Sequence, residues 1–381
     1  MNPVSILKAT WKHLPTGLQQ ETVNLLCRLQ ADKRDGTAQA SGPLYVLGSH
    51  RAATGLGVSA RSYSAAREKD GYEVVRVDIT REMFQNPEFS LEEVRAITLA
   101  QARHATGPGT VSLHANPPLF HLALVAAGRR FLREKRLIAY WAWELEKLSP
   151  LYRHGLDYAD AFEVPSTFVQ QAVVKDTAKE VTVVPHRVAP PARCKSCYAE
   201  DGILRCLFIF DMASSYERKN PLAAIEAFTK AFPDGGAELT LKVSQAGADP
   251  LRHREIMQAA SRPGIRVVTE MLSDIDLEKL YLAHDVYLSL HRSEGYGLTI
   301  REAMLCGLHV VAVGWSGNMD FMHGERVHPV PYALVPVRAR GSMRGMEPRW
   351  AEADTDAAAQ ILRDLRHTLV ASGCQATERS V

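Results

Sequence analysis

The chain has 381 residues, of which 46% are hydrophobic and 23% are charged. This length favours two domains, and the composition is typical of a soluble globular protein, which excludes disordered and collagen-like chains. No run of about 18 apolar residues exists, the N-terminus lacks a secretory signal pattern, and a net charge of +2 gives no reason to expect nucleic acid. We therefore expect a cytoplasmic protein that binds no nucleic acid.

From residue 44 onwards, short apolar segments alternate with segments of helix length. Residues 1–40 are predicted to form an N-terminal extension with a short helix and a loop. Strands are predicted at 44–49, 72–78, 110–115, 137–143, 161–166 and 181–185, and helices at 58–69, 90–103, 117–130 and 166–178. This alternation predicts a parallel sheet covered on both faces, which is a doubly wound, Rossmann-like α/β domain over residues 41–187.

A proline-rich segment at 185–202 interrupts the alternation, and we assign residues 188–203 to a linker. Within it, Cys194 and Cys197 have the CxxC spacing of a zinc half-site or a redox pair. No second half-site follows at the usual distance, so a solvent-facing connector is the simpler interpretation.

The α/β pattern then starts again and predicts a second Rossmann-like domain over residues 204–345. Strands are predicted at 204–211, 239–244, 265–270, 286–290, 309–314 and 334–337, and helices from Pro221, near 250–261, after Ser273 and from about Thr299. In residues 346–381 a final helix near 354–371 is expected to pack back across the hinge. Two such domains are expected to face each other across a deep cleft, where doubly wound sheets bind their ligands.

The segment HRSEGYGLTIREAM (291–304) follows a predicted strand and opens a predicted helix. Gly295 and Gly297 allow a tight turn that leaves the amides of residues 296–299 pointing outward at a helix N-terminus. Free N–H donors and the positive end of the helix dipole favour an anion such as phosphate. Glu294 and Glu302 would repel a phosphate unless they bind hydroxyl groups beside it. The alternative is an ordinary strand–turn–helix connection in which Glu294 caps the helix.

Glu294 and Glu302 have an E-x7-E spacing, and SEGYGLTIREAMLCGLHVVAV resembles the donor-site signature of family 4 retaining glycosyltransferases of the GT-B fold. Segments 217–228, 274–295 and 316–321 also fall in the order of that family. The resemblance is strong over most of 204–340 and looser over 44–190. It implies two Rossmann-like domains facing each other, a nucleoside diphosphate sugar as donor, and neither a cofactor nor a metal ion.

The resemblance also assigns roles within the second domain. Glu302 is expected to hold the ribose hydroxyls, Glu294 to contact the transferred sugar near the reacting centre, and Arg218 and Lys219 to neutralise the leaving diphosphate. The family often has an arginine where this chain has Ala213, so either Arg218 takes over or the phosphate clamp is weaker. The remaining donor-site candidates are Gly295, Tyr296, Gly297, Leu298, Thr299, Met271, Gly55 and Gly57.

In the first domain, the glycine-rich loop that ends at Gly55 and Gly57 is not a GxGxxG motif, so a dinucleotide cofactor is not expected. By the resemblance this loop closes on the donor diphosphate or lines the acceptor pocket, and the alternative is a turn that needs positive φ. His114 ends a predicted strand and is expected to point toward the cleft, and the resemblance implies that it contacts the transferred sugar. The alternative is a histidine with a purely structural role.

Glu144 follows another predicted strand and comes directly after the two tryptophans of YWAWELEK. We expect this carboxylate to bind the acceptor, with the neighbouring aromatic rings stacked either on a sugar or in the core.

Two charged motifs allow simpler explanations. Asp274 and Asp276 form a DxD, the metal motif of a different glycosyltransferase fold, but capping of a helix by Ser273 explains them better. Basic residues are dense over 129–136, and residues 1–190 hold 23 Lys and Arg against 19 Asp and Glu. This surplus predicts either contact with an anionic membrane that carries a lipid-linked acceptor, or a solvated helix face.

Together with these features, the resemblance implies a retaining, metal-independent transferase of the hexosyltransferase type. The acceptor is expected to be a hydroxyl of a glycan or a lipid-linked oligosaccharide, in the assembly of cell-surface polysaccharide or lipopolysaccharide. The enzyme is expected in the cytoplasm, at or near the inner face of the cell membrane. Two alternatives remain open: another GT-B activity, either an inverting transferase or an epimerase, and a catalytically weak partner that binds a nucleotide sugar within a glycan assembly complex.

Overall fold

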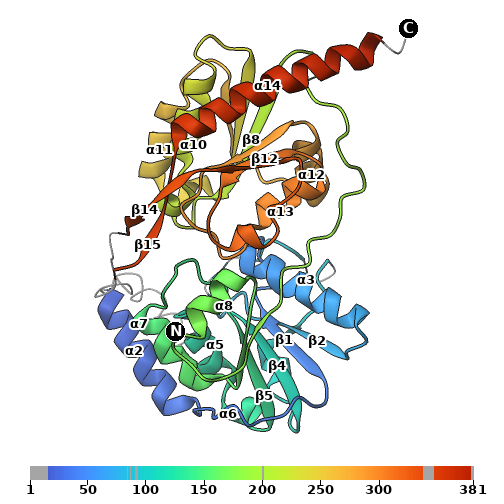
Figure 1. Cartoon of the computed structure of the whole chain (residues 1–381). Coiled ribbons are helices and arrows are strands. Elements are labelled where there is room, and N and C mark those ends of the chain that lie inside the picture. Colours follow the sequence, from blue (N-terminus) through green and yellow to red (C-terminus); the bar gives the residue numbers. More distant parts are fainter. Residues whose placement is uncertain are drawn as a thin grey trace. The chain divides into compact units, whose positions relative to one another are not determined.

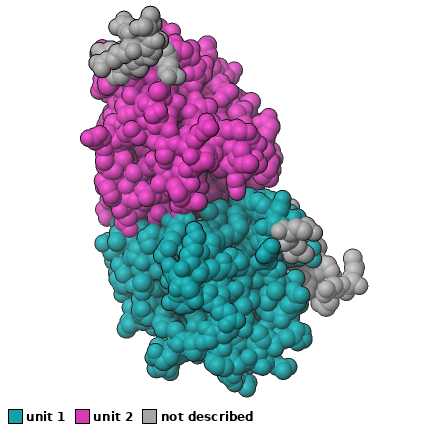
Figure 2. All heavy atoms as spheres, turned by 90° about the vertical axis from the view of Figure 1, so that its right-hand side faces the viewer, with its two compact units in different colours: residues 1–187, 337–348 teal, residues 188–336, 349–381 magenta. Residues whose placement is uncertain are grey.

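The computed structural model describes residues 16–83, 85, 87–90, 93–199, 201–337 and 347–378. It divides into two compact units, coloured separately in Figure 2: Met1–Arg187 with Val337–Pro348, and Val188–Pro336 with Arg349–Val381. We call them the N-terminal and the C-terminal unit.

The N-terminal unit is built around a seven-stranded sheet whose strands all run parallel. In the order β3-β2-β1-β4-β5-β6-β7, the strands are Ile97–Thr98, Val74–Asp78, Leu44–Gly48, Gly109–His114, Lys135–Tyr140, Ala161–Val164 and Val181–Val183. Every residue of β1 and β4 is buried, as expected for central strands that have helices on both faces. The predicted Rossmann-like architecture of this unit is confirmed.

The helices of this unit lie on the two faces of that sheet, with α3 on one side and α2 and α5 on the other (Figure 1). They are α2 (Thr16–Gln30), α3 (Gly55–Lys69), α4 (Leu99–Ala102), α5 (Leu119–Ala127), α6 (Arg129–Leu132), α7 (Pro150–Gly155), η1 (Leu156–Tyr158) and α8 (Thr167–Val173).

The C-terminal unit contains a second parallel sheet, of six strands. In the order β10-β9-β8-β11-β12-β13, the strands are Ile265–Val268, Ala237–Ser244, Leu204–Asp211, Val286–Ser289, His309–Val313 and Val327–Val330. Its helices are α9 (Tyr216–Lys219), α10 (Pro221–Ala231), η2 (Ala246–Ala248), α11 (Pro250–Ala259), α12 (Asp274–Leu282), α13 (Leu298–Leu305), η3 (Gly317–Asp320) and α14 (Thr355–Glu378). The long helix α14 packs against α10 and against the strands β8, β12 and β13 of the same unit (Figure 1).

Two predicted elements differ from the structure. The helix predicted at 90–103 is restricted to α4, because residues 97–98 pair with β2 as strand β3; Leu91 and Glu92 lie outside the described residues. The strand predicted at 334–337 belongs to β14 (Tyr332–Pro336), which pairs antiparallel with β15 (Arg349–Ala353) rather than joining the parallel sheet. The last parallel strand is instead β13.

Candidate functional site

The turn after β11 leads into α13 and has the geometry that the glycine spacing predicts. Gly297 precedes the helix with φ +94°, and a Cβ there would lie 3.2 Å from Cδ1 of Ile300, so glycine suits both the conformation and the space. Among the described residues no side chain caps α13, so the alternative that Glu294 caps this helix is wrong. The first backbone amides of α13, at Leu298 and Thr299, therefore lie at an uncapped, positive helix end.

Glu294 lies before this turn, against two cations that the chain supplies from α9. Its Oε1 is 3.2 Å from Nη1 of Arg218 and also forms an ion pair with Nζ of Lys219. Glu294 and Arg218 are only 8% and 5% exposed. Burial alone would raise the pKa of Glu294, but Lys219 and Arg218 outweigh burial and lower it from the ordinary 4.5 to about 2. The structure thus brings together three of the predicted site residues in one buried charge cluster.

Arg218 is fastened in place by further hydrogen bonds. Its Nη1 donates to the carbonyl of Ser293 at 2.7 Å, and its Nη2 donates to Oγ of Ser214 at 2.8 Å. Ala213 makes no such link, and its amide donates to Asp211 in the turn that follows β8. Arg218, and not residue 213, therefore supplies the guanidinium group beside Glu294.

Glu302 lies on α13, between one and two turns beyond its start. Tyr281 of α12 donates its hydroxyl to Oε2 of Glu302 at 2.7 Å, and burial raises the pKa of Glu302 to about 7. The same hydroxyl also lies 3.3 Å from the carbonyl of Thr299. Met271 is 71% exposed in the segment between β10 and α12, and Tyr296 packs its ring 4.9 Å from that of Phe321.

The glycine-rich loop of the N-terminal unit follows β1 and begins α3. Thr54 caps α3 by accepting from the amide of Gly57, and Gly55 is the first helical residue. A Cβ at Gly57 would lie 2.2 Å from the carbonyl oxygen of Ala52, whereas φ is not positive at either glycine. Close backbone approach, rather than positive φ, is therefore why Gly57 is glycine.

His114 does not point outward as predicted. His114 is 1% exposed, and its ring stacks on Tyr140 at 4.3 Å and lies within hydrogen-bond distance of Ser59 (2.8 Å) and Ser112 (3.3 Å). The side chain packs against α3, where it contacts Ser59 and its ring lies 4.8 Å from that of Tyr63. Burial, together with His50 and His186, lowers its pKa well below the usual range, so the imidazole is neutral.

Glu144 is half-buried in the loop between β5 and α7. The two tryptophans that precede it pack in the core: Trp141 is fully buried and lies 4.8 Å from Phe162, and Trp143 lies 4.3 Å from Tyr152. Of the two interpretations of these aromatic rings, core packing is the one observed.

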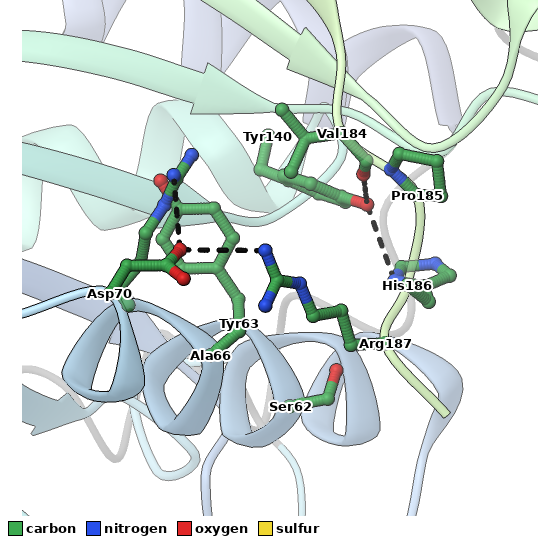
Figure 3. Close-up of a pocket in the computed structure, with 10 residues that line it drawn as sticks. Ser62, Tyr63, Ala66, Asp70, Tyr140, Val184, Pro185, His186 and Arg187 are labelled. Carbon is green, nitrogen blue, oxygen red and sulfur yellow. Dashed lines mark hydrogen bonds and ion pairs between the residues drawn. The ribbon is translucent and has the colours of Figure 1, made fainter. Parts of the chain in front are cut away.

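A pocket opens in the N-terminal unit, between α3 and residues 184–187, which we call the exit segment. Figure 3 shows Tyr140 reaching from β5 to this segment, where its hydroxyl donates to the carbonyl of Val184 at 2.8 Å and lies 3.2 Å from Nδ1 of His186. Arg187 forms an ion pair with Asp70 at 3.4 Å. The sequence pattern did not identify these residues, because they come from three separate elements.

The charged and cysteine motifs are largely structural. Ser273 caps α12, as predicted, and Asp276 forms an ion pair with Lys279. Cys194 and Cys197 are exposed free thiols, and the described part of the chain holds no group of three or more His, Cys, Asp or Glu that could bind a metal.

In the basic run, Lys135 is 2% exposed and donates to three carbonyl groups, whereas Arg129 and Arg136 form ion pairs. Only Arg130 and Arg133 are exposed without an ion pair among the described residues. No helix in the described ranges is both long and apolar enough to cross a bilayer.

Comparisons with known proteins agree with this geometry. Residues 205–340 match the family model described as "Glycosyl transferases group 1". No curated protein matches the chain. The matched residues contain Arg218, Lys219, Glu294 and Glu302, so the match supports a group 1 glycosyltransferase.

Several solved structures share the fold of both units. The Anabaena protein HepE, in complex with UDP and glucose, is 13% identical with a TM-score of 0.61, and the similarity covers 88% of this chain and 94% of that one. A trehalose-6-phosphate protein from E. coli bound with UDP-2-fluoro glucose is 11% identical with a TM-score of 0.56, covering 86% and 94%. The apo lipopolysaccharide outer core galactosyltransferase WaaB is 11% identical with a TM-score of 0.53, covering 75% and 83%. The chain therefore has the predicted GT-B fold, with two Rossmann-like domains.

Proposed function

We propose that this protein is a retaining glycosyltransferase that moves a sugar from a nucleoside diphosphate sugar to a hydroxyl of a glycan or lipid-linked acceptor. The single observation that carries the proposal is the buried cluster in which Arg218 and Lys219 meet Glu294 beside the uncapped start of α13. An enzyme needs positive charge where the leaving diphosphate develops negative charge, and this cluster places two cations and a helix dipole together.

Each carboxylate of the E-x7-E pair has a separate role in this proposal. Glu302, held by Tyr281, accepts hydrogen bonds from the ribose hydroxyls of the donor. Glu294 binds hydroxyls of the transferred sugar near the reacting carbon, and its low pKa keeps it ionised at neutral pH. The bound diphosphate then shares Arg218 and Lys219 with Glu294.

Retention follows if the acceptor hydroxyl attacks from the face that the diphosphate leaves. The sugar–phosphate bond breaks, the acceptor oxygen bonds to the anomeric carbon, and the departing phosphate oxygen takes the acceptor proton. No covalent carboxylate intermediate is needed, and because two side-chain cations neutralise the diphosphate, we propose that the reaction requires no metal ion. Binding of the donor would exclude water that otherwise hydrolyses the sugar.

The proposed acceptor class is the basis on which we propose a pathway. WaaB, one of the similar folds, is a lipopolysaccharide galactosyltransferase by its printed name. We propose for this chain a cytoplasmic role in the assembly of cell-surface polysaccharide or lipopolysaccharide. A peripheral contact with anionic lipid would depend on Arg130 and Arg133, since the other residues of the basic run are engaged within the protein.

One observation keeps a second function open. Ala213 supplies no cation to the cluster. The two terminal nitrogens of the Arg218 guanidinium already bind the carbonyl of Ser293, the hydroxyl of Ser214 and the carboxylate of Glu294. A weaker clamp is compatible with a partner protein that binds a nucleotide sugar but turns it over poorly.

A panel of UDP-, GDP- and ADP-sugars tests the proposal. The true donor should raise the melting temperature, because a ligand that binds only the folded state stabilises it by RT ln(1 + [L]/Kd). With that donor and a hydroxyl acceptor, NMR of the product should show a retained anomeric configuration in the presence of EDTA. Inversion, or epimerised donor, would favour the other GT-B activities, and binding without transfer or hydrolysis would favour the partner protein.

A further inference from the structure

A chain of buried polar side chains joins the loop after β12 to the backbone of Glu294. The amide of Glu294 donates to Oγ of Ser316 at 2.8 Å, and this hydroxyl donates to Oδ1 of Asn318 at 3.0 Å. The same Oδ1 lies 3.1 Å from Nε2 of His291. In the opposite direction, the amide of Gly317 donates to the carbonyl of Glu294 at 2.9 Å. The sequence patterns assign no individual role to His291, Ser316 or Asn318.

Only one assignment of donors and acceptors is consistent with all the hydrogen bonds of this network. Nδ2 of Asn318 donates to the carbonyl of Val313 at 2.9 Å and to Sδ of Met322 at 3.0 Å, so its amide oxygen must face Ser316 and His291. Because Oδ1 can only accept, Nε2 of His291 carries the proton. Burial lowers the pKa of His291 to about 4, which leaves this imidazole neutral at pH 7. Asn318 thus uses both donors and both acceptor positions.

The backbone at Ser316 is strained in a way that serves this network. Its φ is +81°, a region that residues other than glycine rarely adopt. The conformation aims the hydroxyl at the amide of Glu294 and places Gly317 to donate to the carbonyl of Glu294. Strain of this kind persists where the surroundings enforce it, and it is common at functional sites.

We propose that Asn318 is a positioning residue that, through Ser316, holds Glu294 in the position where its carboxylate meets Arg218 and Lys219. Asn318 is fully buried, and among the described residues no hydrogen bond or ion pair joins it to either cation, so its link to Glu294 runs through Ser316. A carboxylate that must meet both a sugar hydroxyl and two cations tolerates little displacement, because misplacement by about 1 Å can cost a hundredfold in rate. This inference rests on the proposed function for the role of Glu294, but the hydrogen-bond network exists without it.

The first test measures amide hydrogen exchange at Glu294 in the full chain without ligand. Asn318→Ala removes the amide to which Ser316 and His291 are hydrogen-bonded. Ser316→Gly removes the hydroxyl and leaves a residue that adopts φ +81° without strain. Both variants should lose protection of the Glu294 amide by at least about tenfold. Thr240→Val is the matched control, because Thr240 is equally buried and contacts His284 elsewhere in the unit. Unchanged protection in Ser316→Gly, which should fold normally, would overturn the proposal.

The second test is a double-mutant cycle on kcat with the nucleotide sugar that stabilises the wild-type chain most. Glu294→Gln should lower kcat about 100-fold, and Asn318→Ala roughly tenfold with little change in donor KM. If Asn318 acts through Glu294, the double variant should stay within about threefold of Glu294→Gln alone. Losses that multiply would mean that Asn318 acts independently and would refute the positioning role.

The two tests separate the two claims. A wild-type chain that neither binds nor turns over any nucleotide sugar would refute the proposed function, and the exchange measurement would still decide whether Asn318 holds Glu294. Normal turnover by the wild type, with full protection and full kcat in Asn318→Ala, would refute the positioning role alone.

Discussion

Replacing Glu294 by Gln removes the negative charge that Arg218 and Lys219 share, and this should destabilise the C-terminal unit at pH 7. The pKa of Glu294 falls from 4.5 to about 2, and this shift corresponds to about 3 kcal/mol of stabilisation. Because the folded-state pKa is the lower one, this stabilisation is complete well above pH 4.5 and disappears as the pH falls toward 2. Of the 3 kcal/mol, about 1 should be lost at pH 4 and about 2 at pH 3.

Urea unfolding at pH 7, 4 and 3 measures this difference between the wild type and Glu294→Gln. Glu255→Gln is the matched control, because Glu255 pairs with Arg252 at 2.8 Å on the surface, where such a pair is worth at most about 1 kcal/mol. The difference in free energy of unfolding between the wild type and Glu294→Gln should become smaller as the pH falls. A gap that is small at pH 7, or that stays constant down to pH 3, would contradict the assignment of Glu294 to a buried ion-pair cluster.

Three further predictions concern other parts of the chain. If Glu302 binds the ribose as a carboxylate, donor affinity should rise roughly tenfold between pH 6 and pH 8, as its proton is lost near pH 7, and calorimetry on Glu302→Gln should show no such rise. Gly57→Ala should cost about 3 kcal/mol, because its Cβ meets the Ala52 carbonyl, whereas Gly247→Ala, with no atom within 4 Å, should leave the urea midpoint almost unchanged. Tyr140→Phe should cost about 1 kcal/mol and speed amide exchange in the exit segment, and unchanged exchange there would show that this hydroxyl does not hold the segment.

Most of the fold could be predicted because central parallel strands are buried on both faces and therefore appear as continuous apolar runs. Strands β1, β8 and β12 follow this rule, and their predicted positions agree with the structure to within one residue at each end. The sequence patterns of strands at the edge of a sheet are less distinctive, so these strands are harder to predict. Strand β13 contains His328 and Pro329 and was not predicted, and residues 97–98 became a strand because β2 offered a partner.

The candidate site was predictable where its residues are close in sequence. The spacing of Glu294 and Glu302 and the glycine before α13 are visible in one short segment. The link from Glu294 to Asn318 could not be predicted, because only the pairing of β11 with β12 brings the loops after these strands together. His114 shows the opposite error: its position at a strand end was predicted, but the direction of its side chain depends on packing beneath α3.

Calorimetric titration with nucleoside diphosphates and the corresponding monophosphates tests the central claim most directly, because the claim is that Arg218, Lys219 and the start of α13 bind a diphosphate. For at least one base, the diphosphate should bind at least about tenfold more tightly than the monophosphate, and Lys219→Met should abolish most of that difference. Equal affinity for the two, or a preference that survives Lys219→Met unchanged, would contradict the account.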